Sequence, residues 1–194
     1  HKKCRTRSSH LNQSAAEFTK KTIDGWCKYK IIFLERGTWD LLPGLLVRHA
    51  QVENIFHETS EFNNQDKNRT PTIGTSVENY LHDQTGNFRL VLKDETEIPA
   101  AANSLISIYY NYASPFFKKY EDINEIEKDV NADINDTSLT GPIFKGTKGS
   151  ILAKLCNREN YTNLQRCYYE YYSNFSKGFY LPSFKKLTDY LKEI

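Results

Sequence analysis

The apolar residues of this 194-residue chain change their spacing near residue 93. Before that point they come in short runs interrupted by Gly, Pro, Asn and Asp, which is typical of strands joined by tight turns. After it they recur every three or four residues over long segments, which indicates amphipathic helices. The sequence therefore predicts a single α+β domain over residues 1–194. An N-terminal antiparallel β-sheet of hairpins (1–93) should pack against a C-terminal layer of helices (94–194).

The strongest turn signal in the first half is Asp24-Gly25, which lies between the strand-like runs 18–23 and 26–34. Asp-Gly is favoured where a two-residue hairpin turn needs positive φ angles twice. We therefore expect a hairpin with Asp24 and Gly25 at its tip. Other strands are predicted at residues 4–9, 39–47 and 87–92, and a short helix is predicted at 51–58.

The second half reads as a series of helices over residues 94–120, 123–130, 148–157 and 161–175, with a last helix that opens at Pro182. Pro115 should break or kink the first of them, because proline lacks the N–H that a helix interior needs. The last helix should turn four residues inward, which are Phe184, Leu187, Leu191 and Ile194.

A tyrosine-rich stripe follows one face of the predicted helix 161–175. Aromatic stripes at helical spacing usually pack into a core, and this is the favoured interpretation. The alternative is that the stripe lines a half-exposed ligand groove.

Composition and charge exclude some classes of function. The net charge is +2, which gives no reason to expect a nucleic acid or a membrane as partner. No apolar run approaches the length of about 18 residues that a membrane-spanning helix needs. The four cysteines form no C-x-x-C pair, as is typical of reduced thiols in a cytosol. We therefore predict a cytoplasmic protein and no cofactor.

His49, Glu53 and His57 are spaced at i, i+4 and i+8. On one helix they would share a stripe that can hold a transition metal, so they are the candidate ligands of a metal-dependent hydrolase. The same stripe borders Val52 and Phe56 and equally fits an ordinary polar flank. If the segment instead begins as a strand, His49 is separated from the other two.

Residues 141–150 partly match a phosphate-binding loop, whose pattern is G-x4-G-K-[ST]. Here Thr147 stands between Gly146 and Lys148, and no apolar strand precedes Gly141. We therefore interpret residues 131–146 as a glycine-containing loop that ends in a helix cap at Thr147.

The N-terminal arm carries four positive charges, at Lys2, Lys3, Arg5 and Arg7. It can contact phosphates, which makes weak nucleic-acid binding an alternative function. It fits better as an edge strand whose Lys and Arg side chains oppose edge-to-edge pairing, because no second basic cluster reinforces it.

Several stretches resemble the uncharacterised bacterial domain-of-unknown-function 4304 family. They are TKKTIDGWCKYKIIF, LLPGLLVRHAQVENIF, SPFFKKYEDINEI and GSILAKLCN. The resemblance implies a cytosolic bacterial α+β protein and supplies no catalytic residues. A relation to toxin-immunity proteins would rest on an analogy of fold and not on any site residue.

No catalytic motif stands out in either half of the chain, and tyrosine, which suits interfaces, is abundant with 13 residues. Our first hypothesis is therefore a non-enzymatic binding module of the bacterial cytosol that contacts a protein partner. The metal-dependent hydrolase and the nucleic-acid binder remain the alternatives. The sequence leaves the oligomeric state and the strand order open.

Overall fold

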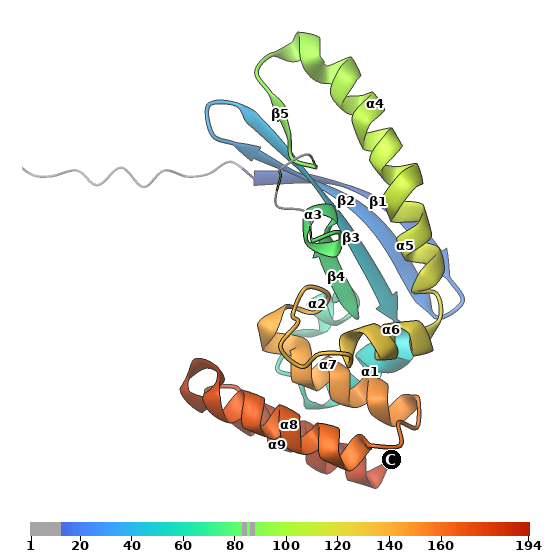
Figure 1. Cartoon of the computed structure of the whole chain (residues 1–194), viewed down its shortest axis with the longest axis vertical. Coiled ribbons are helices and arrows are strands. Elements are labelled where there is room, and N and C mark those ends of the chain that lie inside the picture. The colour runs from blue at the N-terminus through green and yellow to red at the C-terminus, as the bar shows by residue number, and fades with distance from the viewer. Residues whose placement is uncertain (1–12, 83–84, 86–87) are drawn as a thin grey trace, which may run out of the picture.

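The structure, a computed structural model, describes residues 13–82, 85 and 88–194 (Figure 1). Within these residues an antiparallel sheet is followed by a mainly helical region, so the predicted α+β class is confirmed. The predicted strand at 4–9 and the basic arm lie outside the described residues. The strands are β1 (Gln13–Thr22), β2 (Gly25–Glu35), β3 (Trp39–His49), β4 (Ile73–Ser76) and β5 (Leu90–Leu92).

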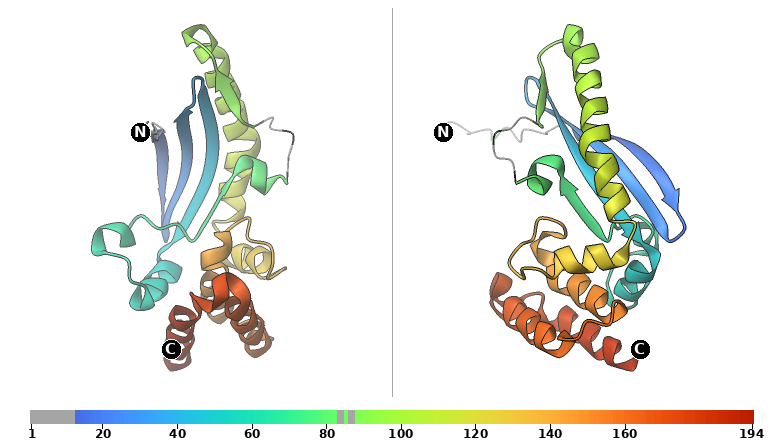
Figure 2. Two further views of the ribbon diagram at one scale, coloured as in Figure 1. Left: turned by 90° about the vertical axis from the view of Figure 1, so that its left-hand side faces the viewer. Right: turned by 45° about the vertical axis from the view of Figure 1, so that its right-hand side comes forward.

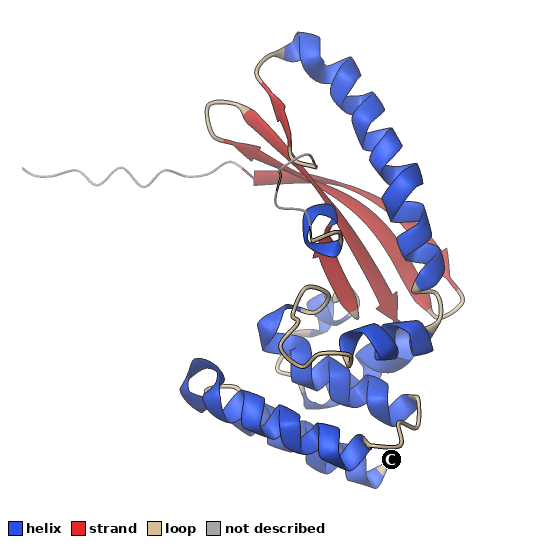
Figure 3. Ribbon diagram, viewed as in Figure 1, coloured by secondary structure: helices blue, strands red, loops and turns tan. Residues whose placement is uncertain are grey.

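The helical elements are most numerous after β5 (Figure 3). The α-helices are α1 (Ala50–Thr59), α2 (Asn64–Lys67), α3 (Val77–Tyr80), α4 (Ile98–Ile108), α5 (Ser114–Lys119), α6 (Ile123–Val130), α7 (Gly141–Leu155), α8 (Tyr161–Asn174) and α9 (Leu181–Glu193). Three short elements join them, which are η1 (Glu95–Glu97), η2 (Tyr109–Ala113) and η3 (Phe175–Gly178).

The sheet is a meander of three long strands, β1, β2 and β3, to which β4 and β5 add at different places along β3. Figure 2 shows β1 at one edge of the sheet and α4 lying across one face. Alternate residues of β2 point to that face, where Cys27, Tyr29 and Ile31 are buried. The Tyr29 hydroxyl donates a hydrogen bond to the Leu105 carbonyl of α4, which fixes the helix to the sheet.

The first hairpin lies where it was predicted, but its turn residues differ. Thr22 pairs with Gly25, so Ile23 and Asp24 form the loop, and neither has a positive φ. The prediction of a turn with two positive φ angles is therefore wrong. Gly25 is needed for another reason, since a Cβ there would lie 1.9 Å from the carbonyl oxygen of Arg48 on β3.

The chain remains helical from α4 through η2 to α5, so of the predicted break or kink at Pro115 the break does not occur. The reason is a π-helical turn, Tyr109–Ala113, in which the Ser114 amide donates to the Tyr109 carbonyl five residues back. In a regular α-helix, the N–H of residue 115 would donate a hydrogen bond to the carbonyl four residues back, and proline has no N–H. The wider π-helical turn lies directly before this position.

The remaining helices gather at one end of the sheet, where α7 packs against α1, α8 and α9 (Figure 1). Leu164, Tyr168 and Tyr172 of α8 are buried there, which confirms that the tyrosine stripe packs into a core. In α9 the predicted inward positions are buried except Ile194, which is 52% exposed at the end of the chain. In the described part of the chain, we find no helix with the length and apolar content that crossing a bilayer requires.

Helix α7 starts at Gly141, so the prediction of a loop up to residue 146 is wrong. Pro142 occupies the first turn, where its lack of an N–H costs nothing. Gly146 and Gly149 lie inside the helix because the rings of Tyr168 and Tyr172 cross it closely: a Cβ at Gly149 would be 2.4 Å from the Tyr168 hydroxyl. The glycines therefore mark close helix packing rather than a phosphate-binding loop.

Candidate functional site

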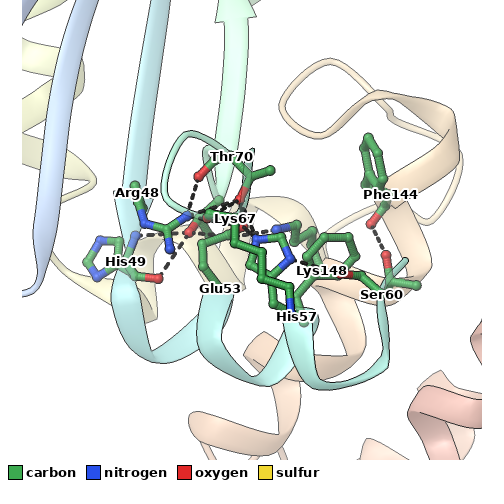
Figure 4. Close-up of polar contacts among 12 residues, drawn as sticks. Arg48, His49, Glu53, His57, Ser60, Lys67, Thr70, Phe144 and Lys148 are labelled. Carbon is green, nitrogen blue, oxygen red and sulfur yellow. Dashed lines mark hydrogen bonds and ion pairs between the residues drawn. The ribbon is translucent and has the colours of Figure 1, made fainter. Parts of the chain in front are cut away.

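A buried polar cluster surrounds Glu53 where the sheet meets the helical end of the molecule (Figure 4). Its side chains come from three places: the end of β3 together with α1, the segment before β4, and the middle of α7. We call these residues the Glu53 cluster; they are Arg48, Glu53, His57, Thr70, Thr72 and Lys148.

Both carboxylate oxygens of Glu53 are occupied, and the side chain is 0% exposed. Oε2 accepts the hydroxyl of Thr70 at 2.7 Å. Oε1 accepts the hydroxyl of Thr72 at 3.0 Å and an ammonium hydrogen of Lys148. A buried carboxylate with three donors is a satisfied group, which is what burial of a charge requires.

Two further side chains meet at Thr70. The Arg48 guanidinium donates to the Thr70 carbonyl at 2.6 Å and lies 3.7 Å from Glu53 Oε2. The His57 ring lies between two hydroxyls, with Nε2 at 2.7 Å from Thr70 Oγ1 and Nδ1 at 2.8 Å from Ser60 Oγ. Because Thr70 gives its proton to Glu53, Nε2 of His57 is the donor to Thr70.

Burial controls the protonation of this cluster. Desolvation lowers the pKa of Lys148 to about 8, although the neighbouring Glu53 carboxylate acts in the opposite direction. Desolvation also lowers the pKa of His57, against the attraction of Glu53. The Lys148 ammonium lies 3.9 Å from the centroid of the Phe56 ring, which adds a cation–π contact.

The three candidate metal ligands do not converge on one point. Glu53 and His57 lie together, with His57 Nε2 at 3.8 Å from Glu53 Oε2. His49 closes β3 with an extended backbone just before α1, and its Nε2 pairs with the Tyr120 carbonyl at 2.9 Å. Among the described residues, no group of three or more His, Cys, Asp or Glu side chains is arranged to hold a metal ion.

The Glu53 cluster acts as a structural clamp between the sheet and α7. The side chains of Glu53 and Lys148 are 0% and 3% exposed, so a substrate has no access to them in this conformation. Sequence reasoning found Glu53 and His57 but missed Lys148. Helical spacing could have indicated that Lys148 is buried, because it precedes the buried residues Ile151 and Leu152 by three and four positions and so shares their helix face.

The depressed pKa of Lys148 predicts a pH effect on stability. Between pH 8 and the usual lysine value near 10.5, the folded state releases this proton before the unfolded state does. The unfolded state then binds more protons, so the free energy of unfolding rises with pH in this window. From pH 7.5 to 9, we expect the wild type to gain about 1 kcal/mol relative to Lys148→Met in urea unfolding.

Taking the difference between the two proteins removes the effect of cysteines and tyrosines that titrate in both. Lys186→Met, at an exposed position of α9, serves as the control and should show no such gain. If the difference in unfolding free energy between the wild type and Lys148→Met were constant from pH 7.5 to 9, the lowered pKa of the buried Lys148 ammonium would be contradicted.

A second feature is an apolar groove of about 640 Å³ between the β1–β2 hairpin and the α4–α5 helix. The strands contribute the floor, with Phe18, Cys27, Tyr29 and Ile31. The helix contributes the wall, with Leu105, Ile106, Tyr109, Tyr110 and Phe117. Its rim is strongly exposed, since Phe18 is 58% and Tyr110 68% exposed.

The free edge of β1 runs along this groove. Among the described residues β1 pairs only with β2, so its other side carries unpaired backbone groups. Thr22 and Gly25 flank a two-residue loop and therefore form a hydrogen-bonded pair, and such pairs alternate along the ladder. The N–H groups that point outward are accordingly those of Ala15, Glu17, Thr19 and Lys21.

Comparison of the chain with known family models, with curated proteins and with solved structures finds no match. The resemblance to the domain-of-unknown-function 4304 family therefore stays a prediction, and function has to be argued from the geometry above.

Proposed function

We propose that this chain is a non-enzymatic protein-binding module that takes an extended segment of a partner protein onto the free edge of β1. The observation that carries the proposal is the coincidence of that edge with the exposed apolar groove. Strand addition uses both features: the edge supplies main-chain hydrogen bonds, and the groove receives alternate side chains.

The groove defines the partner segment that fits. Its floor and wall are aliphatic and aromatic, so every second residue of the added strand should be apolar. Lys20 and Lys21 are exposed near the turn end of β1. They discourage pairing with the same edge of a second copy and favour a partner with an acidic residue at that end.

The state of the Glu53 cluster supports a non-enzymatic role. Its acid, base and ammonium groups are buried and paired with one another, and this suits a clamp better than a reaction centre. The setting we propose is the bacterial cytosol, with an immunity-like role as one form of it. Cys27, Cys156 and Cys167 are free thiols, as a reducing compartment would maintain them.

A displayed library of random decapeptides provides a test that requires no knowledge of the natural partner. We expect enrichment of peptides with apolar residues at alternate positions. Thr19→Pro removes one outward N–H, at a site where an edge strand tolerates proline, and should weaken binding of the enriched peptides at least tenfold.

Thr19→Val is the matched control, because it changes the same side chain and keeps the N–H; it should retain binding. Equal affinity of the proline and valine variants, or no enrichment of any peptide, would contradict the proposal. Circular dichroism of both variants would establish that the sheet is intact.

A further inference from the structure

A second hollow of about 530 Å³ lies at the opposite end of the molecule from the β5–α4 connection, between α1, the start of α7 and the start of α9. Aromatic rings dominate its wall. Those that the argument uses are Phe56, Phe62, Phe144, Tyr172, Phe179 and Tyr180. The volume is in the range of sites that enclose a small organic molecule.

The rings approach from three directions rather than from one. The centroid of Phe56 is 5.8 Å from that of Phe62 and 5.7 Å from that of Phe144, with the latter pair at 90°. From the other side of the hollow come Phe179 and Tyr180, which contact each other edge to face at 5.0 Å. Such an arrangement offers both ring faces and ring edges to a ligand.

Several polar groups of the wall are engaged, and its one carboxylate, Glu61, is not. Ser60 pairs with His57, and the Thr147 hydroxyl donates to the Phe144 carbonyl. Tyr172 donates to the Ile143 carbonyl at 2.7 Å. Glu61 is exposed and forms no hydrogen bond or ion pair with any described residue, and no Lys or Arg of the described chain lines the hollow.

The segment that brings Phe179 to the hollow has an unusual backbone. Ser176 and Lys177 have φ angles of +50° and +56°, and Gly178 follows with +78°. Two successive left-handed residues other than glycine are disfavoured, and such conformations often accompany functional sites. The outcome here is an aromatic side chain that is 75% exposed at the rim of an aromatic hollow.

We infer that this hollow binds an organic ammonium ion with apolar substituents. The negative faces of the aromatic rings attract a cation whose charge is shielded by methyl or methylene groups, and Glu61 supplies the opposite full charge. A ring of this wall already contacts a cation, since Lys148 lies over Phe56 and is balanced by Glu53. The site is separate from β1 and does not depend on the proposed strand addition.

The test compares probes of the same shape and different charge. Benzyltrimethylammonium should bind the full chain in an NMR or calorimetric titration, and its neutral isostere neopentylbenzene should bind at least about fivefold more weakly. Glu61→Gln and Phe179→Ala should each raise the dissociation constant of the cation about two- to fivefold. Both positions are exposed, so these variants should fold.

Glu58→Gln is the matched control, since Glu58 is exposed on α1 and does not line the hollow; it should leave the affinity unchanged. Equal binding of the neutral isostere, or tighter binding of benzenesulfonate, would overturn the inference. So would a cation affinity that Glu61→Gln and Phe179→Ala leave unaltered.

Discussion

Replacing Glu53 with alanine is expected to lower the free energy of unfolding by about 3–5 kcal/mol, measured by urea denaturation. The substitution removes the acceptor of Lys148 and of two threonine hydroxyls, all within the buried interior. The ammonium and the nearby Arg48 guanidinium then lack a balancing charge, and this desolvation penalty is the larger part of the loss.

Asn54→Ala is the natural control, because Asn54 is the next residue of α1 and is exposed. It should change stability by no more than about 0.5 kcal/mol. The double variant Glu53→Ala/Lys148→Met should be more stable than Glu53→Ala alone, since it also removes the stranded ammonium. If Glu53→Ala were as mild as Asn54→Ala, the clamp would be excluded.

Gly25→Ala should cost about 2–4 kcal/mol, because the new methyl group would meet the backbone of β3 rather than a side chain that can move. The Cβ position lies 1.9 Å from the Arg48 carbonyl oxygen, and φ at Gly25 is +155°. The β1–β2 hairpin would have to move away from β3 to accept it. Thermal or urea unfolding measures the effect.

The comparison is with Gly37→Ala, in the turn between β2 and β3. There φ is +85° but no atom lies within 4 Å of the position that the new methyl group would take, so only the backbone conformation opposes the change. We expect a cost of about 1–2 kcal/mol. Equal losses at the two glycines would show that the close approach of Gly25 to β3 has no energetic consequence.

Local signals predicted much of the fold. The alternation of buried and partly exposed residues in β2, and the three- and four-residue spacing of apolar residues in α6, α8 and α9, can each be seen within a single segment. The structure has these elements where the patterns predict them. Glycine and proline were misread for a physical reason. Gly25, Gly146 and Gly149 are present because another segment approaches them closely, and a π-helical turn accommodates Pro115. Neither cause is visible in the local sequence.

The Glu53 cluster was predictable only in part. Glu53 and His57 are four residues apart on one helix, so their proximity follows from helical geometry. Lys148 is 95 residues from Glu53, and no spacing rule links them. His49 left the expected stripe because β3 extends to that residue, an alternative that the sequence allowed and could not decide.

The two proposed binding surfaces were not predictable, since each combines segments that are distant in sequence. Tyr109 packs against Tyr29 of β2, yet Tyr110 beside it is exposed at the rim of the groove over β1. In the aromatic hollow, Phe56 and Phe179 line the same cavity although more than 100 residues separate them. Exposure of such large side chains is informative only once the fold is known.

Hydrogen exchange of the β1 amides, with and without a saturating library-selected peptide, tests the central claim most directly. If the peptide adds to the sheet, the outward N–H groups of Ala15, Glu17, Thr19 and Lys21 should exchange at least tenfold more slowly in the complex. Unchanged exchange at these four amides, with protection elsewhere on the molecule, would contradict binding by strand addition at β1.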